Sequence, residues 1–156
     1  MTGMRGRRRS LAAGLAAALL LPATALAGQS PRVNYMLNCQ GCHLPDGRGM
    51  SGKVPDLRGE LPRFLEVPGG REFVVQVPGT ANSKLSDADT ADLLNWLIKE
   101  MGASDAAPFQ HYTEAEVRRL RMQRLQNVAP VRAGLVEQIR NLRKPAPPAS
   151  STPTPR

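Results

Sequence analysis

The sequence CQGCH, at residues 39–43, decides most of what this chain can be. The pattern C-x-x-C-H is the attachment signature of c-type haem. Two thiols at this spacing can form thioethers with the two vinyl groups on one edge of a porphyrin. The histidine that follows can then bind the iron. We therefore predict one covalent haem c on Cys39 and Cys42, with His43 as the proximal iron ligand.

Other chemistries explain this cysteine pair less well. A disulfide between Cys39 and Cys42 would close a very short loop, and such a loop stabilises a fold little. A structural zinc site usually needs four ligands, but the chain has one other histidine, His111, and no third cysteine. A thioredoxin-like redox pair would require a βαβ pattern, which the flanking sequence lacks. Haem attachment remains the prediction.

The first 27 residues have the pattern of a secretion signal. Arginines between Arg5 and Arg9 form a basic start, residues 11–21 are apolar, and small residues surround Ala27. This pattern predicts a cleaved leader at 1–27 and a periplasmic protein, the compartment in which bacteria attach c-type haem. A second reading keeps the leader uncleaved as a membrane anchor, since the apolar run is just long enough to span when tilted.

The remaining chain divides by charge and composition. Residues 28–104 carry a net charge of −1, whereas residues 105–156 carry +5. We predict a haem domain at 28–104, a basic helical extension at 105–144, and a disordered tail at 145–156, because that tail is rich in proline, serine and threonine. A domain of roughly 75 residues has a marginal apolar core of its own. A buried porphyrin would supply much of the missing contact.

Helical patterns predict an all-α protein. The clearest helix runs from 87 to 101, with Ser86 as its N-cap, acidic residues in its first turns and Gly102 at its end. A capping box, Thr113 to Glu116, opens another helix. The full set of expected helical stretches is 33–39, 62–67, 71–77, 87–101, 113–127 and 131–144, with loops at 43–59 and 78–83.

Four stretches around CQGCH form a recognisable set. Tyr35 lies four residues before Cys39, a glycine-rich turn follows His43, the segment PDLRG occupies 55–59, and Trp96 lies on the apolar helix before Gly102. Together, over about half of the chain, they resemble the class I c-type cytochromes. In that family an aromatic on a short N-terminal helix crosses a C-terminal helix bearing another aromatic. The resemblance implies a small cytochrome c fold wrapped around one covalent haem.

The resemblance also implies roles for two residues after the motif. In the family, the carbonyl of the proline in this segment accepts a hydrogen bond from the proximal histidine. Carried over, Pro55 would orient His43, as an outer partner does for most ligating histidines. Leu57 would press against the ring.

The sixth iron ligand is left open by the sequence. The family normally uses a methionine in the loop before the last helix, and this loop has none. Asn82, at about the expected position, and Met101, at the end of the helix, are the two candidates for the distal ligand. Met50, His111 or a ligand from outside the chain are the remaining possibilities.

These observations imply a periplasmic electron carrier that passes single electrons between redox proteins, from a periplasmic dehydrogenase to an oxidase or another cytochrome. No nucleophile or base cluster predicts catalysis, and charge alone does not support nucleic-acid binding. The missing loop methionine motivates an alternative, a haem protein that binds oxygen, nitric oxide or carbon monoxide. Four arginines between Arg118 and Arg124 predict either a solvated helix face or a dock for an acidic partner.

Overall fold

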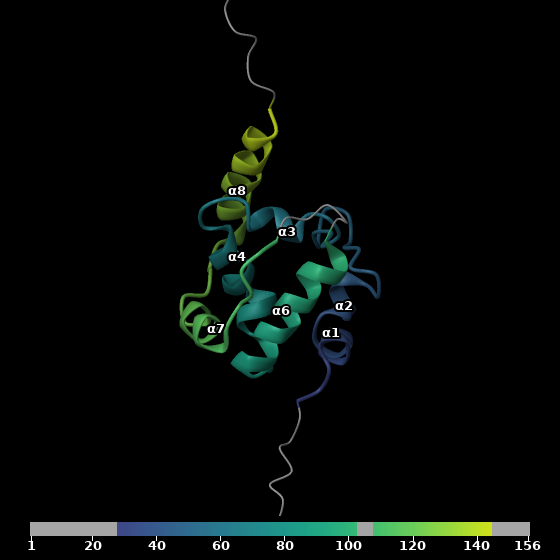
Figure 1. The fold of residues 1–156 in the computed structure, drawn as a ribbon. Coiled ribbons are helices and arrows are strands. Elements are labelled where there is room, and N and C mark those ends of the chain that lie inside the picture. The colour runs from purple at the N-terminus through teal and green to yellow at the C-terminus, as the bar shows by residue number, and fades with distance from the viewer. Residues whose placement is uncertain (1–27, 103–107, 145–156) are drawn as a thin grey trace, which may run out of the picture.

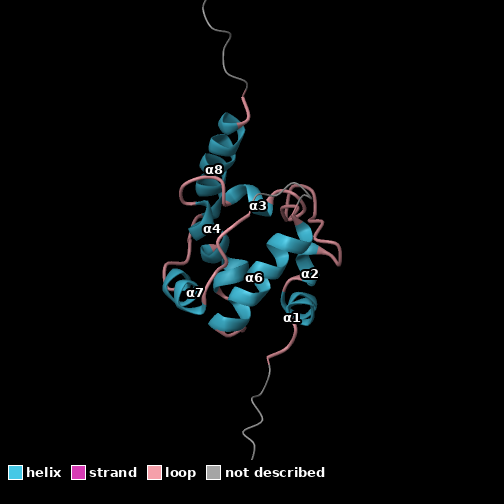
Figure 2. Ribbon diagram, in the orientation of Figure 1, coloured by secondary structure: helices cyan, strands magenta, loops and turns pink. Residues whose placement is uncertain are grey.

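The computed structural model of the chain describes residues 28–102 and 108–144. Within these ranges it consists of helices and loops, and the predicted all-α fold is confirmed (Figure 2). The predicted leader, the predicted tail and the predicted domain boundary after 104 lie outside the described residues. The helices are α1 (Pro31–Asn38), α2 (Gln40–His43), α3 (Leu61–Phe64), α4 (Gly70–Gln76), α5 (Pro78–Ala81), α6 (Asp87–Met101), α7 (Glu114–Arg121) and α8 (Val128–Leu142).

Helix α6 is the central element, and α1 crosses it (Figure 1). The Ser86 Oγ accepts a hydrogen bond of 3.0 Å from the Asp89 N–H, which satisfies one of the unpaired donors of the first turn. The rings of Tyr35 on α1 and Trp96 on α6 lie 5.9 Å apart at a 50° tilt. This aromatic contact fixes where the two helices cross. Among the described helices, none is long and apolar enough to cross a membrane.

The C-terminal helices pack into the same hydrophobic core as the rest of the chain. Helix α7 packs against α4 and α6, and α8 packs against α3 and α4. Figure 1 shows α7 and α1 on either side of α6. Tyr112, Val117, Leu120 and Leu135 are all buried in one cluster with the core of the N-terminal helices. The extension therefore contributes to the core rather than lying on the surface of a finished domain.

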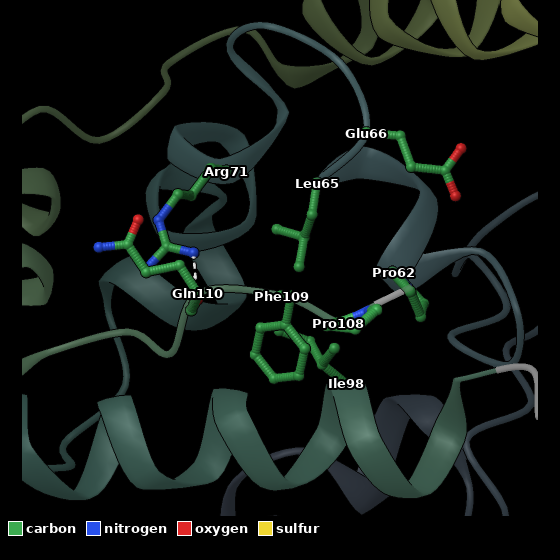
Figure 3. Close-up of a pocket in the computed structure, with 8 residues that line it drawn as sticks. All are labelled: Pro62, Leu65, Glu66, Arg71, Ile98, Pro108, Phe109 and Gln110. Atoms are coloured by element: carbon green, nitrogen blue, oxygen red, sulfur yellow. Dashed lines mark hydrogen bonds between the residues drawn. The ribbon is translucent and has the colours of Figure 1, made fainter. Parts of the chain in front are cut away.

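Arg71 on α4 joins the extension to the rest of the fold. Its guanidinium donates to both carboxylate oxygens of Glu116, at 2.6 and 2.7 Å, and to the carbonyls of Gln110 and His111, at 2.6 and 3.0 Å. It also lies 4.0 Å from the ring centre of Tyr112, whose hydroxyl donates to the Arg71 carbonyl at 2.9 Å. Figure 3 shows the Arg71–Gln110 contact. One side chain thus anchors the start of the extension at several points.

The Arg71–Glu116 pair makes stability depend on pH. Its hydrogen bonds hold the pKa of Glu116 below the ordinary glutamate value, so the pair stabilises the fold above that value and this contribution is lost as the pH falls through the lower, native pKa. We expect Glu116→Gln to lower the free energy of unfolding by about 2 kcal/mol at neutral pH. Urea unfolding across the acidic range should show the variant and the parent converging.

The matched control for this change is Glu137→Gln, because the Glu137 carboxylate pairs with Arg140 while 49% exposed. Exposed pairs contribute little, so this control should stay within about 0.5 kcal/mol of the parent at every pH. If Glu116→Gln lowered the free energy of unfolding by the same amount at neutral and acidic pH, the loss would not come from the ionised Glu116 carboxylate.

Helix α5 is one difference from the sequence prediction, which placed a loop at 78–83. The segment instead forms one helical turn, in which the Ala81 and Asn82 N–H groups donate to the carbonyls of Val77 and Pro78, at 2.8 and 3.0 Å. Proline fits the first helical position because its missing N–H is not needed there. Four residues are too few for a periodic pattern to reveal the helix.

The bounds of the C-terminal helices also differ from the prediction. Helix α7 ends at Arg121 instead of 127, and the Leu125 N–H beyond it donates to the Gln76 carbonyl at 2.9 Å. A long-range contact therefore ends this helix. Helix α8 begins at Val128 instead of 131, because Pro130 lies within its first turn, where proline is tolerated.

Candidate functional site

Tyr35 positions the CQGCH motif. Its side chain is buried, and its hydroxyl donates to the backbone carbonyls of Leu44, at 2.5 Å, and His43, at 3.3 Å. Leu44 has a φ of 58°, in the left-handed region that residues other than glycine rarely adopt. The tyrosine thus holds the carbonyl at the sharp turn that ends α2. Helix α1 and the motif are thereby fixed to each other.

His43 has one ring nitrogen bound to the backbone. Its Nδ1 lies 3.1 Å from the Pro55 carbonyl oxygen, to which it can donate, leaving Nε2 for a metal. A Cβ on Gly49 would lie 1.9 Å from the Val54 oxygen and 2.4 Å from the Pro55 oxygen, so only glycine lets the chain pass here. Burial lowers the pKa of His43, against the opposing effect of the Pro55 bond. The neutral ring that results is the form that binds metals.

Both cysteines carry free thiols in the structure. Cys39 is half-buried and Cys42 is exposed. Burial, with a smaller effect of the neighbouring Cys42, raises the pKa of Cys39 to about 11. Cys39, Cys42 and His43 all border one cavity.

This cavity has a volume of about 310 Å³ and an apolar lining. The cavity is bordered on one part by α2, which packs against α1. It is also bordered by α5, which packs against α4 and α7. Its principal lining residues are Cys39, Cys42, His43, Pro55, Leu57, Leu61, Phe64, Phe73, Val74, Val77, Leu93, Leu94 and Leu97. Apolar walls with a few convergent polar groups are typical of cofactor sites. Two free thiols, an imidazole with Nδ1 engaged and these walls fit a haem c.

The two candidates for the distal ligand do not line the cavity. Asn82 lies at the end of α5, outside the set of lining residues. Met101 packs beside the glycine turn that follows the motif, where a Cβ on Gly47 would lie 2.3 Å from its Sδ, and its carbonyl accepts from the Gly59 N–H at 2.8 Å. Their role as ligands stays a prediction.

The other side chains considered for this position also lie away from the cavity. Met50 is 40% exposed and is not among the residues that line the cavity. The His111 ring packs on Phe109 at 5.1 Å. Within the described residues, His43 is therefore the only histidine, and no methionine is found, among the side chains that line the cavity.

Several residues of the cavity wall were not predicted from the sequence. Thr80 and Ser83 come from α5 and the loop after it, and Val128 and Arg132 come from α8. Val128 and Arg132 are four residues apart and lie on the same helical face as the buried Leu135. A prediction that started this helix at 128 would therefore have placed both residues on the buried face. No local signal identifies Ser83.

Arg121 holds the loop that carries Ser83. Its guanidinium donates to the carbonyls of Ala81, Ser83 and Leu85, at 3.2, 2.5 and 2.8 Å, and to the Asp87 carboxylate at 3.0 Å. The Arg121 side chain is only 16% exposed. Of the four arginines predicted to form a solvated or docking face, this one points inward and fixes the cavity wall.

A second cavity, of about 340 Å³, lies where the extension meets α3 and α6. Leu65 points toward Phe109 and Ile98 there, with Arg71 and Glu66 at the rim (Figure 3). Its lining contains no cysteine or histidine among the residues that the structure describes. It therefore belongs to the packing of the extension rather than to the haem site.

Comparison with known proteins assigns the family. The chain is 31% identical over 130 residues to a cytochrome c-552 of Thermus thermophilus, an alignment that covers 71% of this chain and 87% of that protein. It is 29% identical over 116 residues to another Thermus thermophilus cytochrome c-552, covering 62% and 88%. No family model and no solved structure matched.

The chain belongs to the class I c-type cytochromes. It is a mono-haem electron-transfer cytochrome that carries covalently bound haem c and acts with redox partner proteins. The alternative of a gas-binding haem protein is not favoured by these relatives.

Proposed function

We propose that Cys39 and Cys42 form the two thioether bonds to haem c and that His43 binds the iron through Nε2. The cavity that all three residues border supports this assignment, because its apolar walls and convergent polar atoms match the chemistry of the group. Pro55 orients the imidazole because its carbonyl accepts a hydrogen bond from the His43 Nδ1–H, and Leu57, which lines the cavity, would pack against the porphyrin. Haem supplies the one-electron chemistry when bound, its iron alternating between the ferric and ferrous states.

The protein residues serve this transfer by fixing the surroundings of the iron. The apolar side chains of α4 and α6 exclude water and lower the local dielectric, which shifts the reduction potential. The Tyr35 hydroxyl and the Pro55 carbonyl hold the motif and the ligand ring rigid, so that little rearrangement accompanies a change of charge. These contacts suit a carrier rather than a catalyst, in agreement with the absence of a nucleophile–base cluster in the sequence.

The carrier is further proposed to be periplasmic. The basic, apolar and small-residue pattern of residues 1–27 supports export. The proposed donor is a periplasmic dehydrogenase, and the proposed acceptor is an oxidase or another cytochrome. Arg119 and Arg124, on and just after α7, are the cations that could attract an acidic partner.

The haem assignment is tested by mass spectrometry of the full chain produced in a host that attaches c-type haem. We expect a mass increase of one haem that survives acid–acetone extraction, and its loss when Cys39 and Cys42 are both replaced by serine. Optical redox titration of the parent should give a reversible one-electron transition. Ser51→Ala, in the exposed loop after the motif, is the control and should retain the haem. A double serine variant that keeps extraction-resistant haem would refute the assignment.

A further inference from the structure

A groove of about 420 Å³ lies between α3 and α8, two helices that pack against each other (Figure 1). Its base is apolar, because Phe64 is buried and the other two apolar lining residues are half-buried. Charged side chains form the rest of its lining. An apolar centre with a charged, solvent-accessible rim is the usual anatomy of a protein–protein interface. The lining residues are Glu60, Arg63, Phe64, Val136, Ile139, Arg140, Arg143 and Lys144.

Phe64 brings this groove next to the haem cavity. The same side chain lines both spaces, and its ring lies 5.0 Å from that of Phe73, which also lines the haem cavity. At this point a molecule seated in the groove would be separated from a haem in the cavity by one side chain. Electron tunnelling slows steeply with distance, so this short separation suits a face through which an electron leaves.

The charges of the groove favour an acidic occupant. Four of its lining residues are cations, whereas Glu60 is its one lining carboxylate and is paired with Arg132 at 2.9 Å. Arg63, next to Phe64 in the sequence, forms no ion pair among the described residues. The groove therefore presents a half-buried cation, beside its apolar base, for which a partner's carboxylate is the matching group.

The remaining cations of the rim are held loosely. Arg143 lies 3.8 Å from Glu66, and Lys144 lies 4.0 Å from Glu137, which also pairs with Arg140 at 2.5 Å. All of these side chains are exposed by more than a third. Exposed pairs contribute little to stability, so these cations can turn to the carboxylates of a partner at small cost.

We propose that the groove between α3 and α8 is the docking site for an acidic surface of a redox partner protein, and that the electron leaves past Phe64. One electron moves from the ferrous haem to the oxidised centre of the partner, and no bond forms or breaks. The inference rests on the haem attachment and electron transfer proposed above, and it adds the face on which the partner sits. The rival route is the edge at the exposed Cys42.

The test follows oxidation of the haem-loaded ferrous protein by stopped-flow absorbance, with ferricyanide as an anionic probe and tris(phenanthroline)cobalt(III) as a cationic one. We expect the double variant Arg63→Gln, Arg143→Gln to react about tenfold more slowly with ferricyanide, because the groove loses the charges that attract anions. The cobalt complex should react no more slowly than with the parent. At 1 M salt, where charges are screened within about 3 Å, the ferricyanide difference should vanish.

The matched control removes the same charge from the loop that follows the haem motif. Arg48→Gln, Lys53→Gln changes two exposed cations there and should react with ferricyanide within about twofold of the parent. If the two double variants were slowed equally, net charge rather than the groove would govern the reaction. If the control were slowed more, electrons would leave at the Cys42 edge. Either result would overturn the inference.

A membrane is the other occupant that a basic, partly apolar groove could accept. Sedimentation with phosphatidylglycerol vesicles distinguishes it, and we expect Arg63→Gln, Arg143→Gln to sediment like the parent. Vesicle binding that the double variant abolishes would assign the groove to anionic lipid and overturn the protein partner. Haem mass is verified before each measurement. Missing haem mass would therefore refute the proposed function, whereas equal ferricyanide rates in fully loaded parent and groove variant would refute this inference alone.

Discussion

Replacing Arg121 by alanine is expected to lower the free energy of unfolding by about 3 kcal/mol. The substitution leaves the Asp87 carboxylate without its inward partner and the carbonyls of Ala81, Ser83 and Leu85 without their donor. Removing one member of a shielded ionic network is costly because the remaining groups stay partly desolvated. Urea unfolding followed by circular dichroism would measure the loss.

The matched control is Arg124→Ala, since Arg124 is exposed and lies outside this network. A surface change of this kind should stay within about 0.5 kcal/mol of the parent. Arg121→Lys should restore less than half of the lost free energy of unfolding, because one ammonium group cannot donate to as many acceptors as the planar guanidinium does. Equal stabilities for the two alanine variants would mean that the loop does not depend on Arg121.

Ending the chain after residue 107 is expected to abolish cooperative unfolding altogether. The truncation removes α7 and α8 and with them the buried side chains of Tyr112, Val117, Leu120 and Leu135. Deleting a single large buried side chain costs about 2 to 5 kcal/mol, and a small domain is stable by only about 5 to 15 kcal/mol. Thermal unfolding of the haem-loaded protein, followed in the far ultraviolet, would show a broad change without a transition.

The control for this truncation ends the chain after residue 144 and so removes only the segment predicted from its composition to be disordered. It should unfold like the full chain. The pair of truncations also tests the domain boundary that the sequence predicts after residue 104. A 1–107 protein with a sharp transition and bound haem would make the extension a separate module, against the shared core.

The sequence predicts well those features that local patterns determine. The helix from Asp87 to Met101 follows from its cap, its acidic first turn and its apolar spacing, and the structure has the same bounds. The contact between Tyr35 and Trp96 follows from the family resemblance. The Nδ1 of His43 lies within hydrogen-bonding distance of the Pro55 carbonyl, although the iron ligation itself stays a proposal.

What the sequence could not predict depends on contacts distant in the chain. Arg121 has the same local setting as Arg118 and Arg119, and only the approach of the loop around Ser83 distinguishes it. The cavity wall from α8 was missed because the predicted helix began at 131, after Val128, and no local pattern shows that α8 packs against α3 and α4. Tertiary partners, rather than propensity, decided these features.

The hydrogen bonds between the extension and the earlier helices affect the order in which parts of the molecule fold. They close long segments of chain: 45 residues between Arg71 and Glu116, 40 between Arg121 and Ala81, and 72 between Arg132 and Glu60. Contacts of such separation form late and slow folding, because loop-closure entropy is lost before they contribute. The wall formed by Ser83 and α8 is therefore completed last, and until then the cavity is open for a bulky cofactor to enter.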